Sequence, residues 1–392
     1  MSTTRLPAMP PLTSRHVAGA GGLVAARELS REGHTVVVFK KQNQVGGTWV
    51  YSPNTESDPI GLDPNRNIVH TSLYASLRTN LPREVMGFRD FPFVETGRVH
   101  RDPRRFPGHE EVLGEVASKK GGGDQVDEVY DAVVVCNGHY TEPRIADIPV
   151  LIGSSTSGVD ISKAIAGVAR EVHIAARSNM DGFNGIPGYK NMWRHSMIVS
   201  AHEDGNIVFQ DGNAVCADII LHCTGYKYHF PFLDTNGNVT VDDNRVGPLC
   251  KHIFPPSLAP WLSFVGLPWK VVPFPLLEFQ GKWIAGILSG RISLPSREEM
   301  MKDVNAFYSS LEASGVPKRY THNMSDYQFA YNDWLANELG CSPSEEWRKQ
   351  MFSATSKNRA ARPETYHDEW EDTHLVSEAH EDFIKYTCKR PS

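Results

Sequence analysis

The sequence predicts an α/β fold in which parallel strands alternate with helices, with a β-hairpin insertion and a helical C-terminal part. Runs of apolar, mostly β-branched residues indicate strands buried on both faces, and they occur at 34–39, 131–136 and 148–152. Helical patterns occur at Leu23 to Arg31 and at Gly158 to Ala169. Strands and helices in alternation favour a parallel, doubly wound sheet.

The hairpin is expected within residues 206–216. Residues 206–210 and 214–216 have the character of short strands. The dipeptide Asp211-Gly212 lies between them and favours a tight turn. We therefore expect two antiparallel strands here, inserted into the α/β pattern.

The C-terminal part has the signals of helices. Pro295 precedes Ser296, and Glu299 follows three residues later, which is the pattern of a capping box. The spacing of apolar residues predicts a helix over 300–311.

Length and charge limit the classes of protein and partner. The 392 residues are more than one hydrophobic core usually serves, so at least two domains are expected. The formal net charge of −6 argues against nucleic acid and anionic membranes as partners. Residues 1–16 are polar and rich in proline, and no apolar run approaches the roughly 18 residues of a membrane span. No targeting or membrane segment is expected.

The cysteines favour a reduced, cytoplasmic setting. None of them forms a CxxC pair, so neither a zinc knuckle nor a dithiol redox centre is expected, and we predict no metal site. The six positions are Cys136, Cys216, Cys223, Cys250, Cys341 and Cys388.

A glycine-rich loop opens the first predicted helix. It consists of Gly19, Ala20, Gly21, Gly22 and Leu23. A glycine turn between strand and helix lets the backbone approach a pyrophosphate, and the helix N-terminus adds free N–H groups and a positive dipole end. This loop is therefore a candidate dinucleotide site.

A second loop follows the expected strand at 148–152. Its residues are Gly153, Ser154, Ser155, Thr156, Ser157 and Gly158. The next strand is expected at 172–176, and Arg177 follows it near the position from which a ribose-reading residue acts. A cation there favours a 2′-phosphate and hence NADP over NAD. Two dinucleotide loops in one chain are typical of flavoproteins in which NADPH reduces a bound flavin.

Further segments, in a fixed order along the chain, carry a family resemblance. They are Gln44–Tyr51 with Gly46, Gly47 and Trp49; Leu77–Glu84 with Asn80; Cys136–Tyr140; and Leu221–Tyr226 with Thr224 and Gly225. Together they resemble the plant flavin-containing monooxygenases, and most nearly those that S-oxygenate methylthioalkyl glucosinolates. The similarity extends from about His16 to the C-terminus.

The resemblance implies two Rossmann-like units, one for FAD and one for NADP, and a monooxygenase activity. NADPH would reduce FAD, O2 would then form a flavin hydroperoxide, and oxygen would pass to the sulfur of a small thioether substrate. Asn80 would be the catalytic residue that hydrogen-bonds the hydroperoxide. The FAD contacts implied are Gly19, Ala20, Gly21, Gly22, Leu23, Lys40, Gly46, Gly47, Trp49, Asn80, Thr224 and Gly225. The NADP contacts implied are the six loop residues Gly153 to Gly158, and Arg177.

Domain limits are expected from the same resemblance. A truncated FAD-binding portion would cover 1–149, and a truncated NADP-binding portion would cover 150–204. Residues 205–392 would return to the FAD domain and add the helical C-terminal region.

Three departures from the family pattern concern the cofactor sites. The first glycine and the end of the opening strand are missing, so that Gly19 and Gly22 take the second and third glycine positions. Lys40 stands where the family has an acidic residue, and lysine cannot accept a hydrogen bond from ribose. Stretches are also missing near 121–123 and before Val150. These losses predict weak FAD binding, with NADP binding better preserved.

Two alternatives to an S-oxygenase remain open from the sequence. One is a degenerate, non-catalytic relative that at most binds NADP, and the other is an N-hydroxylating monooxygenase. A disulfide reductase of related two-dinucleotide design is excluded because it requires a CxxC pair.

Overall fold

The computed structural model divides the chain into two compact units. One unit comprises Met1–Tyr51, Thr71–His139 and Tyr228–Ser392, and the other comprises Ser52–His70 and Tyr140–Lys227. The chain therefore leaves the first unit twice and returns to it each time. The domain limits expected at 149 and 204 stay a prediction. The structure describes residues 19–39, 46–51, 73–93, 102–116, 130–140, 142–143, 156–176, 184–186, 188–221, 223–362 and 365–387.

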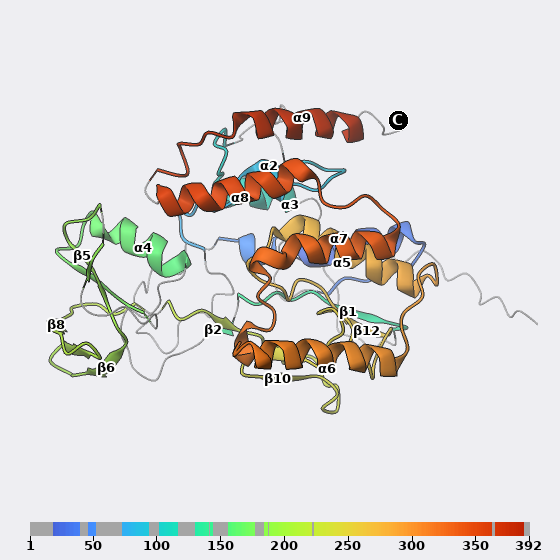
Figure 1. Ribbon diagram of the computed structural model, residues 1–392, viewed down its shortest axis with the longest axis horizontal. Helices are drawn as coiled ribbons and strands as arrows, with labels where there is room; N and C mark the ends of the chain where they lie inside the picture. The colour runs from blue at the N-terminus through green and yellow to red at the C-terminus, as the bar shows by residue number, and fades with distance from the viewer. Residues whose placement is uncertain are drawn as a thin grey trace, which may run out of the picture. The chain divides into compact units, whose positions relative to one another are not determined.

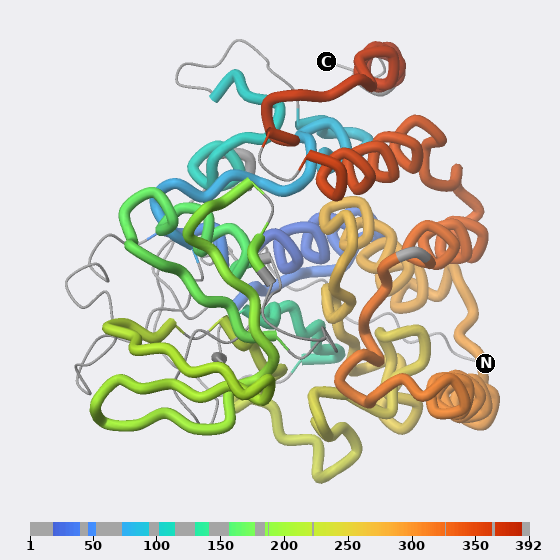
Figure 2. Tube along the Cα trace, turned by 60° about the vertical axis from the view of Figure 1, so that its left-hand side comes forward, coloured from blue at the N-terminus to red at the C-terminus, as the bar shows by residue number. Residues whose placement is uncertain are grey.

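The centre of the first unit is a pair of helices beside a short parallel sheet. α1 (Ala20–Arg31) lies along α5 (Pro273–Leu288), as Figure 2 shows. The helices approach closely at Gly281, where an added Cβ would lie 3.5 Å from the Cα of Ala25. β1 (Val133–Val135) pairs in parallel with β12 (Leu262–Phe264). The helix predicted at 23–31 and the strand predicted at 131–136 are thus confirmed, with different ends.

The strand predicted at 34–39 is wrong. α1 ends with Gly33 in the left-handed region (φ +87°), and the N–H of His34 donates to the carbonyl of Leu29 at 3.1 Å. The residues after this cap form no ladder with any described segment, and the side chain of Phe39 is 68% exposed. β-Branched residues favour a strand only where a neighbouring strand offers pairing and packing partners. The local pattern is present, but no segment that the structure describes pairs with it.

The helical C-terminal part is confirmed, including its capping box. α6 (Arg297–Ala313) begins after Ser296, whose hydroxyl accepts from the N–H of Glu299 at 3.2 Å. The carboxylate of Glu299 accepts from the N–H of Ser296 at 2.9 Å, so the capping box satisfies two donors of the helix N-terminus. The helices after it are α7 (Gln328–Leu339), α8 (Glu346–Ala361) and α9 (Thr373–Thr387).

In its described part, the second unit contains three small sheets and the helix α4. After α4 (Thr156–Ala166), β3 (Val172–Ala175) pairs in parallel with β5 (Met192–His195), and β4 (Asn184–Gly185) adds an antiparallel edge. The predicted hairpin is confirmed as β7 (Asn206–Phe209) and β8 (Ala214–Cys216). The sequence had not indicated β6 (Ile198–Ala201), which extends the hairpin to three strands. The remaining strand pair here is β2 (Glu142–Pro143) with β9 (Tyr226–Lys227).

The other elements belong to the first unit and complete its framework (Figure 1). They are η1 (Gly47–Trp49), α2 (Arg83–Met86), α3 (His109–Val116), β10 (Thr240–Asp242), β11 (Arg245–Gly247), η3 (Lys318–Tyr320) and η4 (Ser325–Tyr327). No helix among the described residues is long and apolar enough to cross a membrane. The five cysteines within the described ranges are all free.

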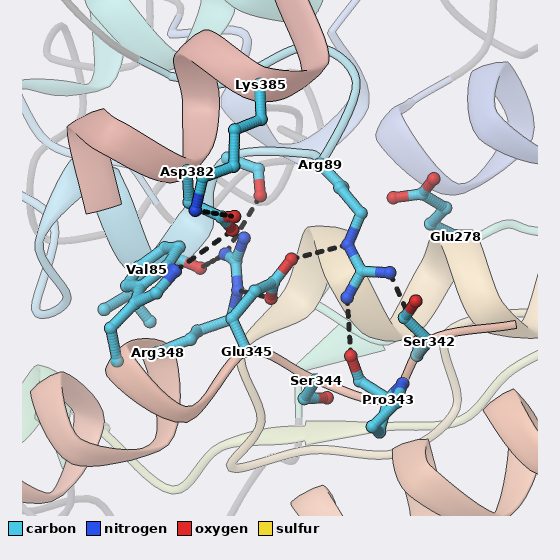
Figure 3. A network of polar contacts seen from close by, with 12 residues as sticks. Val85, Arg89, Glu278, Ser342, Pro343, Ser344, Glu345, Arg348, Asp382 and Lys385 are labelled. Atoms are coloured by element: carbon cyan, nitrogen blue, oxygen red, sulfur yellow. Dashed lines mark hydrogen bonds and ion pairs between the residues drawn. The ribbon is translucent and has the colours of Figure 1, made fainter. Parts of the chain in front are cut away.

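A network of charges fixes α2 to α8 (Figure 3). The guanidinium of Arg348 is buried and donates to the backbone carbonyls of Glu84, Val85 and Gly87, at 3.3 Å for Glu84 and 3.0 Å for Gly87. Glu345 accepts from Arg348 at 2.8 Å and from Arg89 at 2.6 Å. Burial raises the pKa of the Glu345 carboxyl, but the charges of Arg348 and Arg89 outweigh burial and lower it to about 2.

The lowered pKa of Glu345 predicts a stability that depends on pH. The carboxylate stabilises the fold above its unfolded pKa of 4.5, and this contribution is lost as pH falls from 4.5 towards about 2. Glu345→Gln should therefore destabilise the protein at pH 7, and the difference from the unaltered protein should shrink below pH 4.5. Urea unfolding between pH 7 and pH 3 measures this.

Glu346→Gln is the matched control for this change. Glu346 follows Glu345, the N-cap residue, as the first residue of α8, and it is exposed. Its replacement should have little effect at any pH. A constant difference between Glu345→Gln and the unaltered protein over the whole pH range would contradict the assignment.

Candidate functional site

Two glycine segments of the first unit, the loop at 19–23 and the pair Gly46-Gly47, touch each other. Gly19 is the N-cap of α1, and Gly47 lies against it with a left-handed φ of +55°. A Cβ on Gly47 would lie 2.8 Å from the Cα of Gly19, and a Cβ on Gly46 would overlap the side chain of Leu113. Only glycine fits at positions 46 and 47, so the motif has a steric cause in this fold.

The N-terminus of α1 presents backbone donors rather than side chains. The first-turn N–H groups of Ala20, Gly21 and Gly22 have no intrahelical acceptor, and the helix dipole adds positive charge there. On the inner side, a Cβ on Gly21 would reach ordinary contact distance from Cys136 at 3.7 Å, so the helix packs closely on the end of β1. Leu23 donates its N–H to the carbonyl of Gly19 at 3.1 Å and closes the turn. These residues fit the pyrophosphate of a dinucleotide such as FAD.

Trp49 is placed by the turn that follows these glycines. Its backbone N–H donates to the carbonyl of Gly46 at 3.1 Å, and its half-buried ring packs against the main hydrophobic core. That core also contains Val24 and Ala25 of α1. This packing fixes the Gly46-Gly47 segment to α1, whose N-terminus carries the loop at 19–23.

Asn80 lies on a segment held firmly on both sides. Thr79 is buried, and its N–H donates to the carbonyl of Pro107 at 2.9 Å. On the other side, Arg83 donates its backbone N–H to the carbonyl of Arg105 at 3.0 Å. Asn80 itself is half-buried, and its side chain has no hydrogen-bond partner in the described part of the chain. The backbone on both sides of Asn80 is thus hydrogen-bonded to the segment that precedes α3.

Arg83 strengthens the second of these supports. Its buried guanidinium donates to the backbone carbonyls of Asp102 and Arg104, at 2.7 Å for Arg104. It also lies over the ring of Phe93, with 5.3 Å between the guanidinium carbon and the ring centroid, which is within the range of a cation–π contact. A buried guanidinium needs several acceptors, so these bonds fix the start of α2 to the segment before α3.

The second unit contains the other sequence-predicted residues in part. α4 begins at Thr156, Ser157 is exposed, and Gly158 is buried. The strand predicted before Arg177 is confirmed as β3. Thr224 and Gly225 also belong to this unit, directly before β9, and Gly225 has a left-handed φ of +85°. The predicted residues Lys40, Gly153, Ser154, Ser155 and Arg177 lie outside the described residues, as does the strand predicted at 148–152.

The supports of Asn80 were missed by the sequence analysis. The imidazole of His367 bonds to the carbonyl of Thr79, and the two residues are 288 positions apart in the chain. Arg78 forms an ion pair with Asp368 across a similar separation. No local pattern indicates such pairings, because the partners meet only when the C-terminal part folds back.

Comparison with known proteins gives consistent matches to one family. The family model described as flavin-binding monooxygenase-like matches residues 190–349, and that of an NAD(P)-binding Rossmann-like domain matches residues 18–72. The flavin-containing monooxygenase FMO GS-OX-like 4 of Arabidopsis thaliana is 54% identical over 97% of this chain and 100% of its own length. FMO GS-OX5 of the same plant is 51% identical over 94% of this chain and 93% of its own.

This chain belongs to the flavin-containing monooxygenase family. The solved structure of S-allyl-L-cysteine S-oxygenase from Allium sativum has a TM-score of 0.85 and 54% identity, covering 96% of this chain and 100% of that chain. Tmm from Pelagibacter sp. strain HTCC7211 has a TM-score of 0.69 at 22% identity, covering 90% and 92%, and supports the fold alone. The predicted α/β fold and the family resemblance are confirmed.

Membership identifies the cofactors of this monooxygenase as FAD and NADP. The alignment with FMO GS-OX-like 4 spans 450 positions, more than the 392 residues of this chain. The relative therefore has residues without a counterpart here, which is the relation expected of a chain with internal deletions.

The contact between the glycine loops predicts that Gly47 is needed for flavin binding. Gly47→Ala should destabilise the protein and weaken FAD binding by about tenfold or more, since Gly19 must shift at the helix N-terminus. Urea unfolding and titration of FAD by fluorescence quenching measure the two effects.

Gly33→Ala separates this effect from backbone strain alone. Gly33 also has a positive φ, of +87°, but an added Cβ there meets nothing within 4 Å. Gly33→Ala should lower the free energy of unfolding by only about 1–2 kcal/mol and leave FAD affinity unchanged. If both variants lost FAD affinity equally, the loop contact would have no special role.

Proposed function

We propose that this monooxygenase is an S-oxygenase that transfers one oxygen atom from O2 to the sulfur of a small thioether. The overall reaction balances as thioether, O2, NADPH and a proton giving sulfoxide, NADP+ and water. The observation that carries the proposal is the half-buried Asn80, whose flanking backbone is hydrogen-bonded at Thr79 and Arg83, in the unit that also contains the glycine loop at 19–23. The names of the relatives and of the Allium sativum structure support sulfur as the oxygenated atom.

The proposed substrate class is the small thioether, and two candidates represent it. Methylthioalkyl glucosinolates, which would become methylsulfinylalkyl glucosinolates, are one candidate, supported by the sequence resemblance. The S-oxygenase from Allium sativum is named for S-allyl-L-cysteine, which is a thioether too. Both substrates present a sulfur between two carbon atoms, and that shared group defines the class. The cytoplasm is the proposed location, which the free cysteines support.

Residues of the chain would bind the two cofactors, orient them and exclude water. Bound FAD supplies the oxygen chemistry, and NADPH supplies the hydride. The N–H groups of the first turn of α1 would hold the FAD pyrophosphate, and the side-chain amide of Asn80 would donate a hydrogen bond at the reacting end. In the second unit, the loop from Gly153 to Gly158 would hold the NADP pyrophosphate, and Arg177 would pair with the 2′-phosphate. No acid–base triad is required.

Asn80→Ala should uncouple the enzyme rather than unfold it. The lost hydrogen bond is worth roughly 1 kcal/mol or somewhat more, so NADPH oxidation continues while hydrogen peroxide replaces sulfoxide. The measurement is the ratio of sulfoxide formed to NADPH oxidised, with excess FAD and a methylthioalkyl substrate or S-allyl-L-cysteine.

Asn80→Asp tests the same role without loss of volume. Its carboxylate cannot donate a hydrogen bond at neutral pH, so it should uncouple as Asn80→Ala does. An unchanged ratio in both variants would remove Asn80 from the reaction. The absence of sulfoxide from every thioether tested, with hydroxylated amine formed instead, would favour an N-hydroxylating enzyme.

Arg177→Ala should weaken NADP+ binding more than NAD+ binding, because only NADP+ carries the 2′-phosphate. Calorimetric titration of both nucleotides measures the difference. Arg170→Ala is the control, since Arg170 is exposed at the opposite end of β3 and should have no effect. Equal losses for the two nucleotides would contradict a contact with the 2′-phosphate.

A further inference from the structure

The carbonyl of Thr79, one residue before Asn80, is held by a side chain from the C-terminal region. The Nε2 atom of His367 lies 3.1 Å from this carbonyl oxygen. A carbonyl can only accept, so Nε2 carries the proton and donates. The N–H of Thr79 donates to the carbonyl of Pro107, so both polar groups of the Thr79 backbone are engaged. The peptide that leads into Asn80 therefore has a fixed orientation.

Arg78 attaches the same segment to the same region. Its guanidinium makes paired bonds to the carboxylate of Asp368, at 2.9 and 3.1 Å, and a third bond to the carbonyl of Phe106 at 3.0 Å. The fork geometry of such a pair fixes direction as well as distance. Asp368 is exposed, so the pair contributes more to geometry than to stability.

A third contact reaches the other flank of Asn80. The carboxylate of Asp372 accepts hydrogen bonds from both terminal nitrogens of Arg105, at 2.5 and 2.9 Å, and both side chains are buried. The backbone carbonyl of Arg105 in turn accepts from the N–H of Arg83. The buried ring of Phe106 packs against the ring of His367 at 5.2 Å. Residues on both sides of Asn80 are thus connected to one short C-terminal stretch.

We propose that the stretch 365–372, here called the C-terminal clasp, positions Asn80, with His367 as its main positioning residue. This inference rests on the proposed role of Asn80 in oxygen transfer. His367 does not touch the reacting atoms; it acts through the Thr79 peptide. Because a hydrogen bond to a reacting group depends on sub-ångström placement, loosening the clasp should uncouple NADPH oxidation from sulfoxide formation.

The test compares His367→Ala with His367→Gln. The Gln side chain places an N–H₂ donor close to the position of Nε2, so it should retain the bond to Thr79, whereas Ala cannot. We expect His367→Ala to lower the ratio of sulfoxide to NADPH oxidised several-fold, and His367→Gln to restore most of it. His374→Ala is the control, because His374 is an exposed histidine of α9 outside the clasp. It should leave the ratio unchanged.

A second readout is independent of the loaded enzyme. In the flavin-free protein, hydrogen exchange at the Thr79 amide should be faster in His367→Ala than in the unaltered chain, His367→Gln or His374→Ala. If His367→Ala fails to fold, Asp368→Asn replaces it, since that residue is exposed and its change weakens the same attachment.

The outcomes separate the two proposals. If Asn80→Ala uncouples the reaction but His367→Ala keeps full coupling, the clasp inference is overturned and the proposed function stands. If Asn80→Ala has no effect on coupling, the proposed role of Asn80 fails first. In the double variant, His367→Ala should add no further uncoupling to Asn80→Ala. Additive losses would overturn the inference, because His367 would then act through something other than Asn80.

Discussion

The burial of three guanidinium groups is the constraint on which the first unit depends. A buried cation is costly unless it is paired or surrounded by acceptors. Arg348 meets this requirement with carbonyls around α2, Arg83 with carbonyls before α3, and Arg105 with the carboxylate of Asp372. The contacts of Arg348 and Arg105 span 261 and 267 positions of the chain, and those of Arg83 span 21. Satisfying these charges forces residues 78–93, residues 102–106 and the C-terminal helices α8 and α9 into one arrangement.

That arrangement matters because the proposed reaction relies on the placement of cofactors and substrate rather than on an acid–base group of the protein. In such chemistry the protein binds cofactors, orients a few donors and excludes water. The donor role proposed for Asn80 requires that its backbone keep a fixed position. The same logic explains the glycines at 46 and 47, where the absence of a Cβ lets one loop lie directly on the N-terminus of α1.

Elements that depend on residues close together in the sequence were predicted correctly, whereas an element that needs a distant partner was not. The helix of 23–31, the hairpin around Asp211 and the capping box at Ser296 were predicted, because each depends on residues close together in sequence. The strand at 34–39 was not formed, although its composition is strongly β-branched. The β-propensity of these residues is high, but a strand forms only where another strand pairs with it, and that pairing depends on residues far away in the sequence.

The sequence by itself determined the family, the two glycine loops and the identity of Asn80 as a candidate, since these are patterns of residue type and order. Only the tertiary structure decided which side chains hold those patterns in place. His367 and Asp368 have no distinguishing sequence context, and they become meaningful because the chain returns to Thr79 and Arg78 after almost three hundred positions. Motifs report the groups that chemistry needs, whereas their positions are set by buried charges and hydrogen bonds that must find partners anywhere in the fold.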